Sequence, residues 1–231
     1  VENLNQTGTG NTTGTGNASD NVLIGNSGNN QLNGTAGADA LNGGMGNDSL
    51  NGGLGDDILY GNGGADAYQL GLGNDTVIYR YNQDGADDVI EDLTSEQINT
   101  GISDGIDIYK VFNVPMSNSN IHFDIEASVD EMYPNLVLTI GDNNLSLGLK
   151  LTDNWGGIPI GWQGIVIEDF FTRNPQGSNN GTPVLTAAST HDVFVLYADE
   201  GQTEISRMTG QEIYDTYFSP MPPVNHAPTL T

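Results

Sequence analysis

A nine-residue unit that recurs five times without interruption constrains the fold of this chain more than any other feature. The copies read GTAGADALN (34–42), GGMGNDSLN (43–51), GGLGDDILY (52–60), GNGGADAYQ (61–69) and LGLGNDTVI (70–78). Two weaker copies, GNASDNVLI (16–24) and GNSGNNQLN (25–33), precede them. A fixed period of this kind predicts a repeat architecture, in which each unit packs only against its neighbours.

Three positions of the unit have a constant chemistry. The fourth residue is glycine except at Ser19, the eighth is apolar, and the sixth is Asn21, Asn30, Asp39, Asp48, Asp57, Asp66 and Asp75 in turn. Glycine allows a turn to adopt left-handed backbone angles. Carboxylates and backbone carbonyls are the oxygen ligands that a hard cation prefers. One apolar residue per unit is enough to line a thin core.

These roles predict how the chain winds. Six residues make a turn, three make a short strand, and two units complete one coil, so that equivalent turns stack eighteen residues apart. One edge then carries Asn21, Asp39, Asp57 and Asp75, and the other carries Asn30, Asp48 and Asp66. We expect a hard cation between stacked turns to take one aspartate from each, in the pairs Asp39–Asp57, Asp57–Asp75 and Asp48–Asp66. Pairs with an asparagine lack a charged ligand and should bind more weakly or not at all. Asp84 follows in the same register and would close a last site with Asp66, although the glycines are absent there.

The repeat resembles the calcium-binding G-G-x-G-x-D-x-U-x unit of the repeats-in-toxin (RTX) family of secreted bacterial proteins. The resemblance implies a right-handed parallel β-roll with several calcium ions in its turns, where carbonyls of the glycine turn complete the coordination. By position, the implied metal ligands are Gly34, Ala36, Asp39, Gly43, Gly44, Met45, Asp48, Gly52, Gly53, Leu54, Asp57, Gly61, Gly63, Asp66 and Asp75. Richness in Gly, Asn and Asp is also typical of flexible linkers, and that alternative is strongest for residues 1–24.

The composition limits the partners of the chain. It has 30 acidic and 5 basic residues, and the formal net charge is -25. Such a surface repels nucleic acid and anionic membranes and attracts divalent cations. The absence of cysteine excludes disulfides, a catalytic cysteine and a zinc–thiolate site. No apolar run reaches transmembrane length. No signal peptide opens the sequence, which fits a piece of a longer protein and also fits type I secretion, as the resemblance implies.

Past about residue 80 the sequence predicts antiparallel β-structure. Turn-forming residues separate period-two apolar stretches, which we interpret as strands at Ile106–Phe112, Ile121–Ile125, Leu136–Ile140, Leu145–Leu151, Ile165–Asp169 and Val193–Tyr197. Two capping boxes, Thr94 with Gln97 and Thr209 with Glu212, predict short helices, the second near Gly210–Phe218. We expect an all-β protein with three parts: a β-roll (1–79), a β-rich capping or ligand-binding domain (80–218) and a proline-rich linker (219–231). The aromatic residues Trp155, Trp162, Phe170, Phe171 and Tyr197 would form the core of the cap or, alternatively, a binding surface.

The sequence shows little catalytic chemistry. Neither a zinc-binding H-E-x-x-H helix nor a G-x-S-x-G nucleophile elbow occurs. Two acidic pairs, Asp87–Asp88 and Glu91–Asp92, are predicted to form a solvated face or extra calcium ligands rather than a glycosidase site. His191–Asp192 is read as a turn. We therefore expect no enzyme, but a monomeric calcium-binding structural or adhesive module within a longer secreted or cell-surface protein. The alternatives are a calcium-dependent glycan- or peptide-binding domain, with Asn154–Trp162 as the stretch to test, and the non-catalytic tail of a secreted enzyme.

Overall fold

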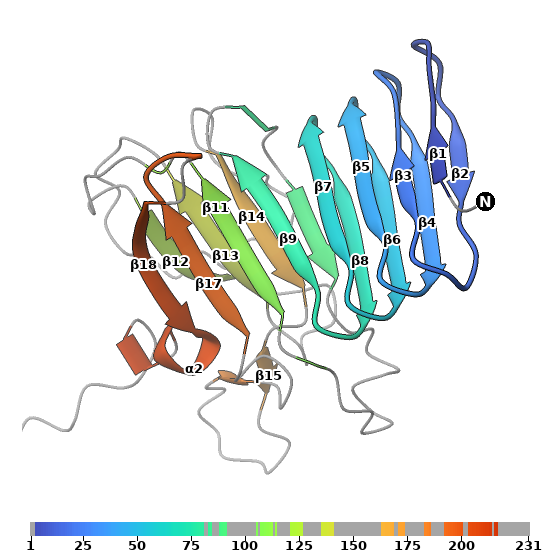
Figure 1. Cartoon of the computed structure of the whole chain (residues 1–231). Helices are drawn as coiled ribbons and strands as arrows, with labels where there is room; N and C mark the ends of the chain where they lie inside the picture. Colours follow the sequence, from blue (N-terminus) through green and yellow to red (C-terminus); the bar gives the residue numbers. More distant parts are fainter. Residues whose placement is uncertain are drawn as a thin grey trace, which may run out of the picture.

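The computed structural model describes residues 3–80, 83–84, 88–91, 105, 107–112, 114, 121–126, 135–140, 163–168, 171–173, 183–185, 192–200, 203–213 and 215–216. Nearly all regular structure in these residues is β-strand, and the coils stack along one axis from β1 and β2 to β17 and β18 (Figure 1). The expected all-β parallel roll is confirmed. Residues 3–24 are part of it, so the linker alternative does not apply to them.

Two eight-stranded sheets form the roll. The first, sheet A, has the order β1 (Asn3–Asn5), β3 (Val22–Ile24), β5 (Ala40–Met45), β7 (Ile58–Gly63), β9 (Thr76–Arg80), β11 (Ile108–Phe112), β17 (Val193–Tyr197) and β18 (Glu204–Thr209). The second, sheet B, has the order β2 (Thr13–Thr15), β4 (Gln31–Ala36), β6 (Ser49–Leu54), β8 (Ala67–Leu72), β10 (Asp88–Glu91), β14 (Gln163–Glu168), β13 (Asn135–Ile140) and β12 (Ile121–Glu126). A small pair, β15 (Phe171–Arg173) with β16 (Pro183–Leu185), lies outside both sheets.

Equivalent residues of successive coils pair in parallel, eighteen residues apart. Leu41 pairs with Leu59 in sheet A, and Leu50 pairs with Tyr68 in sheet B. The eighth residue of each unit points between the sheets, and these side chains are at most 3% exposed: Leu23, Leu32, Leu41, Leu50, Leu59, Tyr68 and Val77. A single apolar position per unit therefore builds the core, as the sequence predicts.

The strands of the central coils are longer than expected. Strands β4 to β8 have six residues each, whereas β1 to β3 have the three that the unit predicts. The additional residues are positions one to three of the next unit, where the pairs Gly44–Asn62 and Met45–Gly63 extend the parallel ladder into the turn. Stacked turns repeat the same backbone angles, so their amides can pair as strand residues do.

The expectation of antiparallel pairing past residue 80 is partly wrong. It holds for β12–β13–β14 and for β17–β18, but β11 pairs in parallel with β9 and β17, and β10 pairs in parallel with β8 and β14. Both sheets thus continue across the expected boundary at residue 79. The expected strands lie within about two residues of those observed, and Leu145–Leu151 lies outside the described residues.

One predicted helix is present at the C-terminal end of sheet A. Helix α2 (Gly210–Ile213) begins after a capping box, in which the Thr209 amide donates to Glu212 Oε2 at 2.8 Å and the Glu212 amide donates to Thr209 Oγ1 at 3.2 Å. It begins at the first residue of the expected helix Gly210–Phe218, residues 215–216 are π-helical, and residues 214, 217 and 218 lie outside the described residues. The other capping box, at Thr94, lies outside the described residues. In the described part of the chain, no helix has the length and apolarity to cross a membrane.

Candidate metal centre

A ladder of buried acidic residues follows one edge of the roll. In each step a backbone amide donates to the Oδ1 atom of the residue one coil further on, at 2.7 to 3.2 Å. This first ladder consists of Asn21, Asp39, Asp57, Asp75, Asp107 and Asp192, all at most 2% exposed. The repeat places its first four members, and β11 and β17 begin directly after the last two.

A second ladder follows the opposite edge in the same way. Amides of Asn30, Asp48 and Asp66 donate to Oδ1 of Asp48, Asp66 and Asp88 at 2.7, 2.8 and 2.9 Å. All four side chains are at most 3% exposed. The aspartates that the sequence assigns to each edge therefore lie together on that edge.

The second carboxylate oxygen of the repeat aspartates, Oδ2, is the atom that could coordinate a metal ion. Oδ2 of Asp39, Asp48, Asp57 and Asp66 is buried and has no hydrogen-bond partner. Burying a carboxylate oxygen without a partner is costly, and a bound cation would remove that cost. The donor set fits calcium, which prefers carboxylate and carbonyl oxygens.

Glycine at position one brings this oxygen close to a backbone carbonyl. A Cβ atom placed on Gly52 would lie 2.4 Å from Asp57 Oδ2 and 2.7 Å from the Leu70 carbonyl oxygen. On Gly34 it would lie 2.3 Å from Asp39 Oδ2 and 2.7 Å from the Gly52 carbonyl oxygen. Any larger residue would fill the space in which the two kinds of oxygen converge. Since no three His, Cys, Asp or Glu side chains of the described residues form a group that could hold a metal, backbone carbonyls would supply the other ligands.

The carbonyls expected as ligands differ in whether they already accept a backbone hydrogen bond. Those of Leu54 and Gly63 accept hydrogen bonds from the amides of Gly37 and Gly46, at 2.9 and 2.7 Å, and so already take part in the backbone ladder. The Gly52 carbonyl oxygen and Asp39 Oδ2 both lie within 3 Å of the Cβ position of Gly34. The remaining predicted residues lie in the same stacked turns: Gly34, Ala36, Gly43, Gly44, Met45, Gly53 and Gly61.

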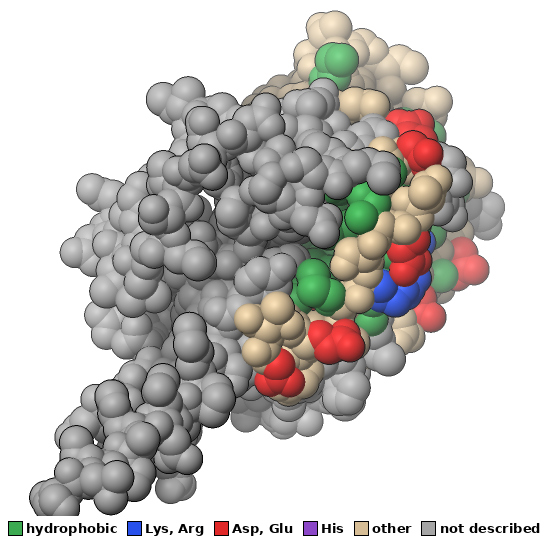
Figure 2. Space-filling view, turned by 90° about the vertical axis from the view of Figure 1, so that its left-hand side faces the viewer, with side chains coloured by type: hydrophobic (Ala, Val, Ile, Leu, Met, Phe, Trp, Pro, Cys, Tyr) green, Lys and Arg blue, Asp and Glu red, His purple; other side chains and the backbone are tan. Residues whose placement is uncertain are grey.

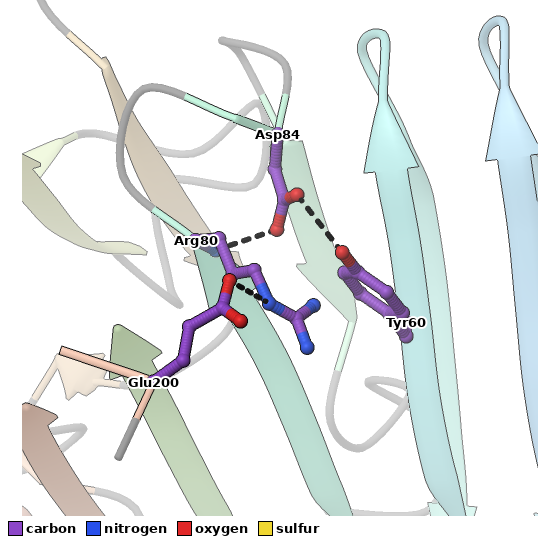
Figure 3. Close-up of polar contacts among 4 residues, drawn as sticks. All are labelled: Tyr60, Arg80, Asp84 and Glu200. Carbon is purple, nitrogen blue, oxygen red and sulfur yellow. Dashed lines mark hydrogen bonds and ion pairs between the residues drawn. The ribbon is translucent and has the colours of Figure 1, made fainter. Parts of the chain in front are cut away.

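Asp84 does not occupy the position expected for it. Asp88 follows Asp66 in the second ladder, 22 residues along rather than 18. The Asp84 carboxylate instead accepts hydrogen bonds from the Arg80 amide at 2.5 Å and from the Tyr60 hydroxyl at 3.4 Å (Figure 3). Arg80 also stacks over the Tyr60 ring at 4.2 Å and forms an ion pair with Glu200 at 3.3 Å. This cluster joins the end of β9 to the turn after β17.

The spacing of the repeats does not assign Asp107 and Asp192 to the ladder. For Asp88 the sequence predicts either a place on a solvated face or a role as a calcium ligand. A signal for all three was present. Each is followed two residues later by a buried apolar side chain, namely Ile90, Tyr109 and Phe194. This is the same D-x-apolar pattern as in the repeats, without the complete glycine turn before it.

Burial shifts the acid–base behaviour of the ladders. Desolvation raises the pKa of Asp57 to about 6, that of Asp66 to about 6 and that of Asp88 to about 8, each against partial compensation by the backbone amide that donates to it. Like charges in neighbouring rungs add to the rise. The roll thus holds its carboxylates in positions that favour either a proton or a cation.

A comparison with protein families agrees with this geometry. The family model described as RTX calcium-binding nonapeptide repeat (4 copies) matches residues 6–41, 15–50 and 42–77. Residues 6–77 contain RTX calcium-binding nonapeptide repeats. A search of curated proteins gives no significant match. The RTX match ends at residue 77, yet both ladders continue past it to Asp88 and Asp192. The calcium-binding role of the RTX repeats therefore rests on the family and on the buried oxygens together.

Proposed function

We propose that this chain is a structural and adhesive module of a larger secreted or cell-surface protein, and that it folds outside the cell when calcium binds. The observation that carries the proposal is the row of buried Oδ2 atoms without partners on Asp39, Asp48, Asp57 and Asp66. Four unpaired carboxylate oxygens in stacked turns oppose folding until a cation neutralises them. Binding free energy then acts as folding free energy.

The charge of the chain supports the same proposal. With a formal net charge of -25, the chain repels itself when no cation is bound. On the face shown in Figure 2, acidic side chains are spread over the described surface and basic ones gather in one patch. Calcium is scarce in the cytosol and abundant outside cells, so such a chain would remain unfolded before export and fold afterwards. The proposal gives the module no catalytic role.

The deciding experiment is far-UV circular dichroism of the chain during a calcium titration after complete chelation. We expect a concerted gain of β-signal at roughly 10⁻⁴–10⁻³ M calcium or somewhat below, as in extracellular calcium modules. Magnesium is the control, because it demands a stricter geometry and dehydrates reluctantly. Full β-structure in chelator would contradict the proposal.

A groove on sheet A favours a second candidate function, the binding of a glycan or peptide. It is a shallow groove of about 470 Å³ that is open to solvent, and its lining includes Met45, Tyr60, Asp84, Asn26, Asn42 and Asn62. An aromatic ring beside amide and carboxylate groups suits a neutral hydroxylated ligand. A glycan array with the calcium-loaded chain and a Tyr60→Ala control would test this. An array on which no glycan binds would leave the structural role as the only proposed function. The stretch Asn154–Trp162, expected as a binding surface, lies outside the described residues.

A further inference from the structure

The second ladder ends in a site that differs from every repeat site before it. Asp66 Oδ2 is buried without a hydrogen-bond partner, and Asp66 as a whole is 2% exposed. The next rung is Asp88, which lies beyond the RTX match, is 1% exposed and accepts from the Asp66 amide at 2.9 Å. The two aspartates are separated by 22 residues, so this rung breaks the repeat register.

A tyrosine hydroxyl enters this site. Tyr68 occupies the eighth position of its unit, where five other units have leucine. Its hydroxyl accepts a hydrogen bond from the Gly61 amide at 3.0 Å and donates one to Asp88 Oδ2 at 3.4 Å. Tyr68 thereby connects the glycine turn that precedes β8 to the carboxylate that begins β10.

The position of the hydroxyl corresponds to that of a carbonyl in the first ladder. A Cβ atom on Gly61 would lie 2.1 Å from Asp66 Oδ2 and 2.4 Å from the Tyr68 hydroxyl oxygen. At Gly52 the equivalent point is 2.4 Å from Asp57 Oδ2 and 2.7 Å from the Leu70 carbonyl oxygen. The phenolic oxygen therefore stands beside the unpaired carboxylate oxygen where a backbone carbonyl stands in the repeat.

We propose that Asp66, Asp88 and the Tyr68 hydroxyl form a calcium site outside the repeat register, at the point where the chain leaves the RTX units. The proposal rests on the proposed calcium-binding function. Two carboxylates and a neutral oxygen are ligands of the kind that calcium prefers. An ion here links β8 to β10 and so joins the repeat coils to the first coil built from other sequence. The competing occupant is a proton held between the same carboxylates.

Ion counting by native mass spectrometry of the whole chain tests the site. We expect Asp88→Asn, which keeps an oxygen for the Asp66 amide but removes the charge, to bind one calcium ion fewer than the parent chain at saturating calcium. Asp56→Asn is the matched control, since Asp56 is exposed and accepts from the Asn74 amide at 2.9 Å. It should keep the full count. An unchanged count in Asp88→Asn would overturn the proposal and favour the shared proton.

Terbium luminescence gives an independent readout if Asp88→Asn does not fold. Terbium replaces calcium at oxygen sites, and a tyrosine in contact with the ion transfers excitation energy to it. We expect Tyr68→Phe to reduce tyrosine-excited terbium emission and to weaken binding at this site by at least about 10-fold, since loss of even an outer partner of a metal ligand typically costs about 10–100-fold. Tyr197→Phe is the control, because its ring stacks on Phe112 at 4.7 Å in an apolar cluster separate from the core between the ladders. Equal emission from both variants would contradict a ligand role for Tyr68.

The two proposals fail in different ways. If the parent chain binds no calcium, the proposed function fails and this site fails with it. If the parent chain binds calcium and folds with it, but neither Asp88→Asn nor Tyr68→Phe changes the ion count or the terbium emission, only the additional site is wrong.

Discussion

The coils inside the RTX repeats and the coils after residue 80 reach the same arrangement from different sequence. In both, a ladder aspartate is followed two residues later by a core side chain, as Asp57 is by Leu59 and Asp192 is by Phe194. Repeat rungs lie 18 residues apart, whereas the later ones lie 22, 32 and 85 residues apart. The difference teaches that the roll is defined by the hydrogen bond between ladder residues of successive coils and by the parallel pairing of their strands. A fixed 18-residue spacing is not required for either.

The two regions also differ in what fills the core. The repeat coils contribute mostly one leucine per nine-residue unit to the core, while the later coils contribute the stacked pair Tyr109–Phe194, with ring centroids 4.7 Å apart. A second stacked pair of the later coils, Phe112–Tyr197, also with centroids 4.7 Å apart, belongs to a separate apolar cluster. Aromatic side chains bury more area and add a stacking contribution of about 0.5–1.5 kcal/mol. Stability in the repeat coils thus depends more on the metal, and in the later coils more on apolar burial.

Removal of calcium should separate the two regions most strongly. We expect amides of β5, β6 and β7 to lose hydrogen-exchange protection in chelator, because each saturated site contributes about 2.7 kcal/mol at 100 times its Kd. Amides of β11 and β17 should retain more protection. Hydrogen exchange read by mass spectrometry measures both regions in one sample. Equal loss everywhere would show that the whole roll depends on the metal as one unit.

Truncation of core side chains should destabilise the later coils more than the repeat coils. Phe194→Ala is expected to cost about 3–5 kcal/mol in the free energy of unfolding, and Leu59→Ala about 2–5 kcal/mol, since both side chains are at most 1% exposed. With calcium saturating, the larger loss should fall on the aromatic coil. Urea denaturation of both variants at the same calcium concentration tests this. A larger loss for Leu59→Ala would contradict the assignment of apolar stability to the later coils.

Glycine substitutions test how closely the coils approach each other. Gly52→Ala places a methyl group 2.4 Å from Asp57 Oδ2, and Gly105→Ala places one 2.2 Å from the Gly73 carbonyl, so we expect each to cost about 1–3 kcal/mol. Gly52→Ala should also weaken calcium binding, because it fills the space between two ligand oxygens. Gly10→Ala is the control, because, like Gly52, it has no left-handed φ, and nothing lies within 4 Å of its Cβ position. Thermal melts with and without calcium measure these effects, and equal losses for Gly10 and Gly52 would exclude the close approach as their cause.

The dependence on pH should reverse when calcium is removed. In chelator, the folded state holds protons on Asp57 and Asp66, whose pKa values are about 6, and on Asp88, whose pKa is about 8, while the unfolded chain releases them near pH 4. This stabilisation is complete below the unfolded pKa and is lost as pH rises through the folded values. With calcium present the carboxylates must be deprotonated to bind, so stability should rise with pH over the same range. Far-UV circular dichroism between about pH 4 and pH 8, with calcium and in chelator, tests this sign through the fraction of folded chain, and parallel slopes in both conditions would contradict it.

The sequence predicts the repeat coils well because position and role coincide there. The spacing of Asp39, Asp57 and Asp75 places them on one edge, and the eighth residues mark the core. The later rungs could not be placed from spacing, because the chain between Asp107 and Asp192 has no fixed length that returns it to the same edge. The pairing direction of β11 does not follow from the sequence, since a short apolar strand has the same pattern whether its neighbour is parallel or antiparallel. The 18-residue period points to Asp84 as the partner of Asp66, whereas Asp88 occupies that position, because the chain no longer keeps the period between Asp66 and Asp88.

The ion pair between Arg80 and Glu200 should show the smallest effect, although it connects the two regions. The Arg80 and Glu200 side chains are 23% and 57% exposed, so solvent screens their attraction. We expect Glu200→Gln to cost about 0–1 kcal/mol. Arg80→Gln should cost more for two reasons. It removes the guanidinium that lies 4.2 Å from the centre of the Tyr60 ring. It also removes the positive charge that lowers the pKa of Asp84, which burial raises to about 7. Urea denaturation at low and high salt separates the two contributions, since only the ion pair should weaken with salt. If Glu200→Gln cost as much as Arg80→Gln, the link between the regions would depend on the ion pair rather than on the stacking of Arg80 on Tyr60.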